Sequence, residues 1–242
     1  MDSAELVEKL VLWIKDKVVA SGCRGTILGM SGGVDSALAA GLCQRAFPQS
    51  VLGVLIPCHS NPQDTEHARL VAEKFSIPTR TVVLDDNYDR LLRVLPEVSA
   101  EPAASRLARA NLKVRLRMAV LYYLANQLKY MVVGSSNRSE LAVGYFTKYG
   151  DGGVDIMPLG NLLKSQVRQL SGFLGIPREI IDKPPTAGLW PGQTDEGELG
   201  FSYDDLDRYL TTGQAASAVG ARIESMIAAS GHKRSRPPTP PF

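Results

Sequence analysis

The sequence predicts an α/β fold, namely a doubly wound parallel sheet of about five strands with helices on both faces. Short apolar runs alternate with longer segments whose hydrophobic residues recur at helical spacing. The apolar runs are continuous, which is typical of strands that are buried on both faces of a parallel sheet. In such a sheet, ligands bind at the carboxyl ends of the strands.

The expected elements follow one another along the chain. Residues 4–20 form an amphipathic helix, because Val7, Val11, Ile14 and Val18 recur at the helical period. Strands are expected at residues 26–30, 51–56, 81–84 and 130–133, and further helices at residues 35–47, 62–75 and 111–129. Two prolines predict a loop over residues 96–105.

The last third of the chain contains long polar segments with glycine and proline. They cover residues 144–155 and 183–204, and irregular segments of that length usually serve as lids or binding loops. We expect residues 1–242 to form one domain, with residues 235–242 as an extended proline-rich tail.

The composition excludes several classes of protein. The 242 residues are 44% hydrophobic and 21% charged, which excludes disorder over most of the chain. The net charge of +2 argues against a nucleic-acid partner and against a polybasic membrane anchor. No apolar run approaches the roughly 18–20 residues of a membrane span, and the N-terminus lacks a signal-peptide pattern. Three cysteines without a C-x-x-C pair indicate a reducing compartment, so we expect a cytoplasmic location.

The segment SGGVDS, residues 31–36, carries the strongest chemical signal. Its two adjacent glycines let an anion approach the backbone closely, and the helix that follows directs free N–H groups to the same point. No lysine follows the glycines, so the segment is not a Walker A loop. Asp35 would repel a phosphate unless a cation lay between them, and Mg²⁺ binds carboxylate and phosphate oxygens together. The segment therefore predicts a phosphate site that uses Mg²⁺.

SGGVDS resembles the pyrophosphate loop of the N-type ATP pyrophosphatases, which activate a carbonyl or carboxylate with AMP and release pyrophosphate. The segments NLKVRLRM, GSSNRSELAVGYFTKYGDGGVDIMPLGNLLKSQVRQL, KPPTAGLWPGQTDEGELGFSYDDLD and HKR look like those of the ammonia-dependent NAD synthetases in that superfamily. The resemblance covers essentially the whole chain, and it implies a fold like that of the adenine nucleotide alpha hydrolases.

The resemblance implies an activity. Enzymes of this family convert deamido-NAD (nicotinic acid adenine dinucleotide) into NAD. The nicotinate carboxylate attacks the α-phosphate of ATP, and ammonia then displaces AMP from the acyl-adenylate. The family also implies a homodimer with the dinucleotide at the subunit interface, for which the first helix and the helix carrying Arg115 are our candidates.

The resemblance also assigns roles to individual residues. The expected ATP contacts are Gly29, Met30, Ser31, Gly32, Gly33, Val34, Asp35, Ser36, Ser135, Lys164 and Thr186. The expected deamido-NAD contacts are Arg115, Lys148, Asp155, His232 and Lys233. Asp35 and Glu140 match the magnesium ligands, and we expect Asp35, Lys148 and Lys164 to be catalytic. Ser135 stands where the family usually has threonine, which predicts looser positioning of ATP.

The nitrogen donor is expected to be free ammonia. The chain is too short for a fused glutamine-hydrolysing domain, and Cys23 lies in SGCRG rather than in the G-x-C-x-G pattern of a nucleophilic cysteine. Two alternatives stay open. A transfer-RNA sulfurtransferase or a GMP-forming amidotransferase subunit would use the same loop, although the first usually carries C-x-x-C pairs and a basic domain. A nucleotide-binding sensor would not need both Asp35 and Glu140, nor the long glycine-rich lids.

Overall fold

The computed structural model describes residues 2–98 and 101–242 and contains a parallel sheet in the strand order β3-β2-β1-β4. The strands are β1 (Gly25–Gly29), β2 (Val51–Leu55), β3 (Thr79–Thr81) and β4 (Tyr130–Val132). The predicted fold class is thus confirmed, with four strands where the sequence indicates about five. A single parallel bridge between Val133 and Ile156 extends the β4 edge in place of a fifth strand.

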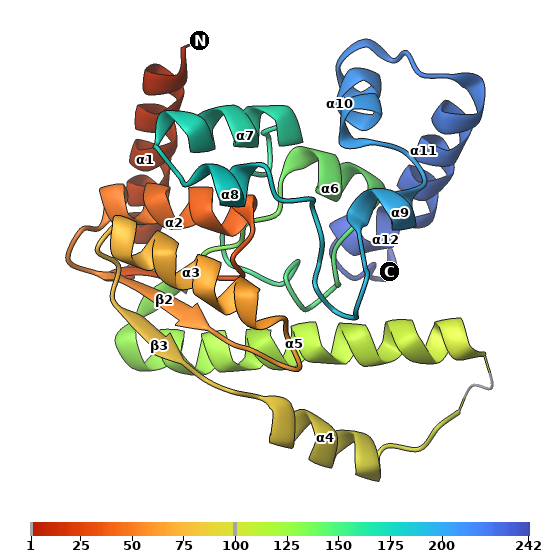
Figure 1. The fold of residues 1–242 in the computed structure, drawn as a ribbon, viewed down its shortest axis with the longest axis horizontal. Coiled ribbons are helices and arrows are strands. Elements are labelled where there is room, and N and C mark those ends of the chain that lie inside the picture. The colour runs from red at the N-terminus through yellow and green to blue at the C-terminus, as the bar shows by residue number, and fades with distance from the viewer. Residues whose placement is uncertain (1, 99–100) are drawn as a thin grey trace.

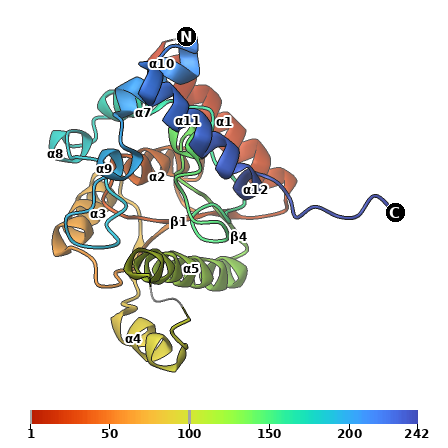
Figure 2. The same ribbon diagram turned by 90° about the vertical axis from the view of Figure 1, so that its right-hand side faces the viewer.

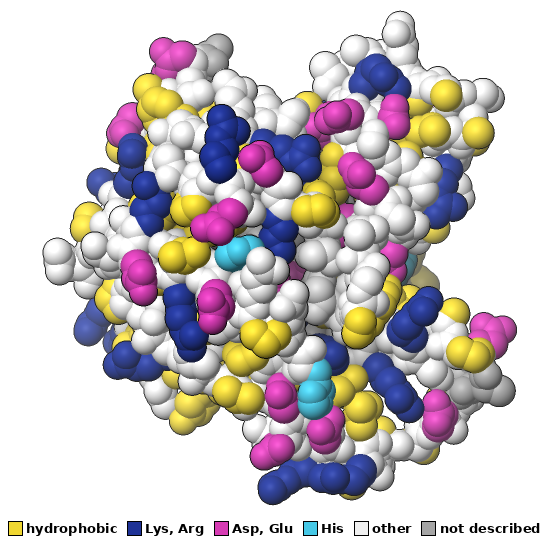
Figure 3. All heavy atoms as spheres, viewed as in Figure 1, with side chains coloured by type: hydrophobic (Ala, Val, Ile, Leu, Met, Phe, Trp, Pro, Cys, Tyr) yellow, Lys and Arg dark blue, Asp and Glu magenta, His cyan; other side chains and the backbone are white. Residues whose placement is uncertain are grey.

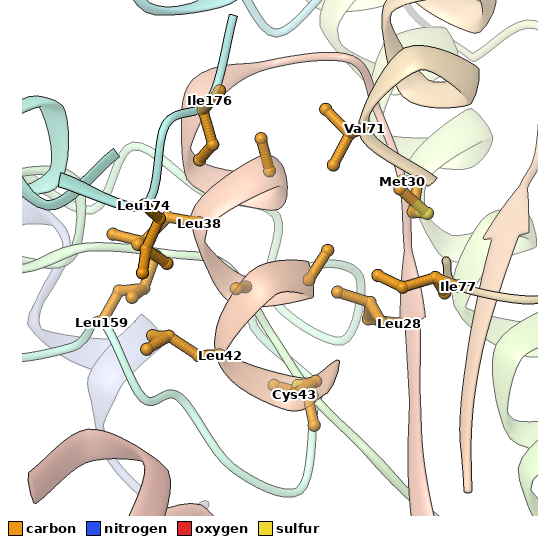
Figure 4. Close-up of a cluster of buried hydrophobic side chains, with 14 of the residues drawn as sticks. Leu28, Met30, Leu38, Leu42, Cys43, Val71, Ile77, Leu159, Leu174 and Ile176 are labelled. Carbon is orange, nitrogen blue, oxygen red and sulfur yellow. The ribbon is translucent and has the colours of Figure 1, made fainter. Parts of the chain in front are cut away.

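Helices cover both faces of the sheet, because neighbouring residues of a strand point to opposite faces. On β1, Leu28 joins one hydrophobic cluster and Ile27 joins the other. The first cluster packs beneath α1 (Ser3–Ala20), α2 (Val34–Ala46), α3 (Pro62–Lys74), α7 (Lys164–Phe173) and α8 (Arg178–Ile181). Figure 4 shows the part of this cluster around Leu38 and Leu42 of α2, with Leu28 of β1 beside them. The second lies against α4 (Asp85–Val94) and α5 (Pro102–Leu128) on the other side (Figure 1).

A smaller helical lobe follows the sheet in the chain. It consists of α6 (Arg138–Val143), α9 (Asp195–Leu199), α10 (Tyr203–Thr212), α11 (Ser217–Ala229) and α12 (Gly231–Arg234). Its own cluster contains Val143, Leu199, Tyr203 and Ile223, each at most 2% exposed. Helix α6 directly follows the β4 edge of the sheet, so this lobe stands beside the carboxyl ends of the strands.

Several sequence-based predictions of secondary structure are wrong. The third strand is β3, two residues earlier than predicted, because pairing with β2 begins directly after Pro78. Helix α5 begins at Pro102, inside the predicted loop, since a proline in the first helical turn has no N–H that needs a partner. Residues 99 and 100 of that loop lie outside the described residues. Helix α4 and the helices that follow β4 have no counterparts among the predicted elements, and α9 and the start of α10 interrupt the predicted irregular segment 183–204.

The surface agrees with the nearly balanced charge. Basic and acidic side chains are interspersed over the face in Figure 3. Residues 235–242 form neither helix nor strand and extend away from the molecule in Figure 2. None of the helices in the described part of the chain is both long and apolar enough to cross a membrane.

Candidate active site

The SGGVDS segment forms a tight loop between β1 and α2. The Oγ atoms of Ser31 and Ser36 lie 3.0 Å apart, and the Gly33 N–H donates to Ser31 Oγ at 3.3 Å. Gly32 has a φ of +77°, and a Cβ on it would lie 2.1 Å from the carbonyl oxygen of Asp64. The loop therefore requires glycine at this position for two independent reasons, its left-handed backbone and its close packing on α3.

A buried lysine lies between the two carboxylates that the sequence predicts as metal ligands. Lys164 Nζ donates to Asp35 Oδ2 at 2.5 Å and to Glu140 Oε1 at 3.1 Å. The Lys164 side chain is 3% exposed, and those of Asp35 and Glu140 are 16% and 15% exposed. Three helices thus bring one positive and two negative groups together.

Asn137 holds this cluster in place although it is absent from the predicted site. Its side chain accepts from the Glu140 N–H, and the Glu140 side chain accepts from the Asn137 N–H, so the pair caps the start of α6. The Asn137 Nδ2 group also donates to Asp35 Oδ1 at 2.7 Å. The asparagine-to-glutamate spacing in NRSE is a sequence signal for such a cap, and it fixes where the Glu140 carboxylate lies.

Burial and charge act in opposite directions on the ionisable groups here. Burial raises the pKa of Glu140, while the Lys164 ammonium lowers that pKa and the Asp35 carboxylate raises it. Burial alone would lower the pKa of Lys164, but attraction to Asp35 and Glu140 is larger and the net shift is upward. Lys164 is therefore a fixed positive charge, and it offsets much of the repulsion between the two carboxylates.

A third carboxylate, Asp195, borders the cluster from α9. It accepts from Tyr203 Oη at 2.9 Å and from Tyr145 Oη at 3.1 Å, and it is 4% exposed. Burial raises the pKa of Asp195, while Lys164 and the two tyrosine hydroxyls lower it. The nitrogen of Lys164 also lies 4.8 Å from the centre of the Tyr203 ring. This side of the site is therefore acidic and closed by aromatic rings.

Two adjoining cavities open at the carboxyl ends of the strands. The smaller, about 170 Å³, is lined by the phosphate loop, by the carboxylate–lysine cluster and by Thr186. The larger, about 580 Å³, has apolar walls from β2, from α5 and from the residue that follows β4, including Val54, Met118 and Val133. Both are bordered by Ser31, Ser135 and Asp64, so they form one continuous space with a charged end and an apolar end.

The structure brings most of the predicted ATP residues to this space. Residues at the end of β1 and in the phosphate loop form one side of the cavities: Gly29, Met30, Ser31, Gly33, Val34, Asp35 and Ser36. Four residues from later parts of the chain also line the cavities, namely Ser135, Glu140, Lys164 and Thr186. Gly32 contributes backbone packing on Asp64 rather than a cavity wall.

The predicted dinucleotide residues are more scattered. Arg115 Nε donates to the Lys148 carbonyl at 3.2 Å, and Lys148 Nζ donates to the His232 carbonyl at 2.6 Å, so these three form a chain of contacts at the surface. Lys233 points inward, where its Nζ donates to the carbonyls of Gly144 and Phe146 and borders the larger cavity. Asp155 lies apart and accepts from Tyr122 Oη and the Val132 N–H.

Arg117 lines the larger cavity but is absent from the predicted site, although it lies only two residues from Arg115. Its guanidinium donates to the Ile56 carbonyl at 3.1 Å and to Ser60 Oγ at 3.0 Å. Positions two apart on a helix face different directions, so Arg115 and Arg117 cannot both face the cavity. The cavity-facing residues Asn111, Val114, Met118 and Leu121 share the helical face of Arg117, and this periodicity is a signal that favours Arg117.

Comparison with known proteins agrees with this geometry. The NAD synthase family model matches residues 6–237. The NH(3)-dependent NAD(+) synthetase of Carboxydothermus hydrogenoformans is 47% identical over 98% of this chain and 97% of its own. The solved NMN synthetase of Francisella tularensis has 36% identity and a TM-score of 0.93 over the full length of both chains. The NH3-dependent NAD synthetase of Campylobacter jejuni has 27% identity and a TM-score of 0.83 over 99% of both. The resemblance inferred from the motifs is thereby confirmed, and the chain belongs to the NAD synthase family.

Proposed function

We propose that the chain is a ligase that amidates deamido-NAD to NAD with ATP and ammonia, releasing AMP and pyrophosphate. The observation that carries the proposal is the phosphate loop facing the Asp35–Lys164–Glu140 cluster across one cavity. Relatives of nearly the same length that are named NH(3)-dependent NAD(+) synthetases support the same reaction.

ATP binds with its phosphates at the charged end of the space and its adenosine in the apolar end. The loop N–H groups, the start of α2 and the Lys164 ammonium offset the negative charge of the phosphates. Arg117 adds a fixed positive charge beside the apolar walls, which suits a nucleotide. Ser135 lies at the junction of both cavities, and Thr186 approaches the phosphates from the opposite side.

Asp35 and Glu140 are the residues that would hold Mg²⁺. Among the described residues, no cluster of three or more His, Cys, Asp or Glu side chains could bind a metal ion alone. Two carboxylates nevertheless fit, because Mg²⁺ is usually bound by one or two protein carboxylates together with substrate phosphates and water. When bound, the ion would offset the charge that develops on the departing pyrophosphate.

The second half of the reaction requires ammonia near the activated carbonyl. Asp195 supplies buried carboxylate acceptors for an ammonium ion at the edge of the same cavity. The hydroxyl groups of Tyr145 and Tyr203 donate hydrogen bonds to this carboxylate. Burial of these groups also excludes water, which would otherwise hydrolyse the acyl-adenylate. Free ammonia as the nitrogen donor, and one domain over residues 1–242, stay predictions.

The nicotinate half of the dinucleotide enters beside Lys233 and the loop of residues 144–148, and the remainder extends over Arg115, Lys148 and His232. These last residues lie at the surface, which supports a site that is completed by a second subunit. Exposed apolar side chains on α1 and α5, including Trp13, Leu107 and Tyr123, are candidates for the contact. Sedimentation velocity of the full chain distinguishes a dimer from a monomer. The expected cytoplasmic location also stays a prediction, as does the absence of nucleic-acid partners.

The test is product analysis. The chain is incubated with ATP, Mg²⁺, deamido-NAD and ammonium, and the products are separated by chromatography. NAD, AMP and pyrophosphate in equal amounts are expected. Formation of ADP, or no turnover in excess ammonium, would contradict the proposal.

A second substrate is deamido-NMN, the mononucleotide that lacks the AMP half. The TM-score of 0.93 to the protein named NMN synthetase, against 0.83 to a protein named NAD synthetase, favours including it. Competition between equal concentrations of deamido-NAD and deamido-NMN gives the ratio of the two kcat/KM values directly. A higher kcat/KM for deamido-NMN would mean that the AMP half of deamido-NAD contributes little to the binding free energy. Arg115, Lys148 and His232 would then lose their proposed role.

A further inference from the structure

One wall of the cavity comes from the segment of residues 183–194 between α8 and α9, here called the lid segment. It contains no helix or strand, yet Gly188, Leu189 and Trp190 at its tip are partly buried and line the larger cavity. In Figure 1 it extends from α8 to the side of α5 and returns to α9. A segment without regular structure needs contacts from elsewhere to keep this position.

A buried lysine on α5 supplies such a contact. Lys113 is 8% exposed, and its Nζ donates to the Leu189 carbonyl of the lid tip at 3.1 Å. The same ammonium lies 5.3 Å from the centre of the Tyr88 ring. Among the described residues, no carboxylate lies within ion-pair distance of it, and Asp85 and Asp89 attract it only from farther away. Lys113 does not line either cavity, so it is not placed to touch a ligand.

This arrangement is costly unless the ammonium has acceptors, because a charge removed from water loses its hydration. Burial lowers the pKa of Lys113, in agreement with that cost. The Leu189 carbonyl is the hydrogen-bond acceptor that the described structure provides. If the lid tip moved away, Lys113 would lose this acceptor. The ammonium therefore favours the closed position.

A second contact acts on the same tip. Arg106 lies on α5 about two helical turns before Lys113. Its guanidinium lies 5.2 Å from the centre of the Trp190 ring. Within the lid, the Leu189 N–H donates to Gln193 Oε1 at 2.8 Å, which keeps the Leu189 carbonyl facing α5. The lid tip is thus oriented from within and held from α5 at two neighbouring residues.

We propose that Lys113 is a positioning residue that holds the lid segment closed over the nucleotide cavity through the Leu189 carbonyl. It acts on ATP binding without touching ATP. The part of the test that concerns ATP rests on the function proposed above, whereas the part that concerns lid position does not.

The chain offers a direct reporter of lid position. It has two tryptophans, Trp13 on α1 and Trp190 on the lid tip. In a Trp13→Phe background, fluorescence reports Trp190 alone, and quenching by acrylamide measures how exposed its ring is. Into this background we place Lys113→Met, which keeps the length of the side chain and removes the charge. Lys74→Met, at an exposed lysine on α3, is the matched control.

We expect Lys113→Met to increase the acrylamide quenching of Trp190 without ligand, while Lys74→Met leaves it unchanged. The melting temperature of Lys113→Met should stay equal or rise, because an unpaired buried charge is removed. The loss of one hydrogen bond predicts an increase of about three- to tenfold in the KM for ATP, with kcat little changed at saturation. Saturating ATP should bring the quenching back to the level of the background protein.

A purely structural role would lower the melting temperature without selectively exposing Trp190. Unchanged quenching of Trp190 in folded Lys113→Met would overturn the proposal, whether or not the chain amidates deamido-NAD. Should Lys113→Met fail to fold, Lys113→Leu is the second variant, which keeps an apolar side chain and removes the donor. We expect the same increase in acrylamide quenching of Trp190 in this second variant. Quenching equal to that of the Trp13→Phe background would also overturn the proposal. Increased quenching with no turnover would support the lid contact and contradict the proposed function instead.

Discussion

The phosphate loop and the lid segment form opposite walls of one space, but they are held in different ways. Within residues 31–36, Ser31, Gly33 and Ser36 bond to one another, whereas Asp35 bonds to Asn137 and Lys164. The lid segment depends on distant partners, namely Lys113 near its tip and Asp64 near its base, where Lys183 Nζ donates to Asp64 Oδ1 at 2.5 Å. A wall held locally should be rigid and specialised for chemistry. A wall held by distant contacts can open and should control access.

This difference predicts that substitutions in the loop wall reduce turnover, whereas those in the lid wall raise the KM for ATP.

The largest effect is expected at Asp35. Asp35→Asn keeps the shape and removes one of the two charges that would hold Mg²⁺, so kcat should fall on the order of 10²–10³-fold. Circular dichroism and the melting temperature serve as controls for folding. Activity near that of the parent would show that the metal assignment is wrong.

The next effect is expected at Gly32. Gly32→Ala forces a Cβ against the carbonyl of Asp64 and a left-handed backbone on alanine. Together these cost about 2–3 kcal/mol, which predicts a loss of kcat/KM for ATP of about 30- to 160-fold. Gly192, in the lid, also has a positive φ, but a Cβ on it would meet no atom within 4 Å, so Gly192→Ala is the matched control with a smaller loss. Equal losses of kcat/KM in Gly32→Ala and Gly192→Ala would contradict the difference proposed between the phosphate loop and the lid segment.

At the lid base, Lys183→Met removes the partner of Asp64, and the side chains of the two are 19% and 18% exposed. Partial burial makes the pair stronger than a surface ion pair, and its loss predicts an increase of about tenfold in the KM for ATP. Steady-state kinetics at saturating deamido-NAD measure this change. Arg178→Met, which breaks the exposed pair with Asp182, should change the KM little. A fall in kcat with unchanged KM would place Lys183 in the chemistry rather than in the lid.

The smallest effect is expected at Ser135, where the two cavities join. Ser135→Thr adds one methyl group and keeps the hydroxyl. Tighter packing should lower the KM for ATP by about twofold, within the usual range for one added methyl group. Ser136→Thr, at a neighbouring position that is 5% exposed, tests whether any added methyl has this effect. A higher KM in Ser135→Thr would mean that the cavity has no room for the group.

The family resemblance supplied nine of the twenty residues that line the smaller cavity, whereas sequence patterns alone determined the parallel α/β class and the phosphate loop. These features follow from local rules: continuous apolar runs make buried strands, and paired glycines before a helix make an anion site. The same rules missed helix α4, where acidic residues dominate the first turn and a single residue, Tyr88, is buried.

Only the tertiary structure decided which charged groups meet. Lys164 lies between Asp35 and Glu140, residues 129 and 24 positions away along the chain. On α5, Arg115 faces outward while Arg117 faces the cavity and Lys113 faces the lid, because each position on a helix is rotated from the last and the neighbours decide what it meets. Spacing can place residues on a face of a helix. What lies opposite that face depends on contacts between segments far apart in the sequence.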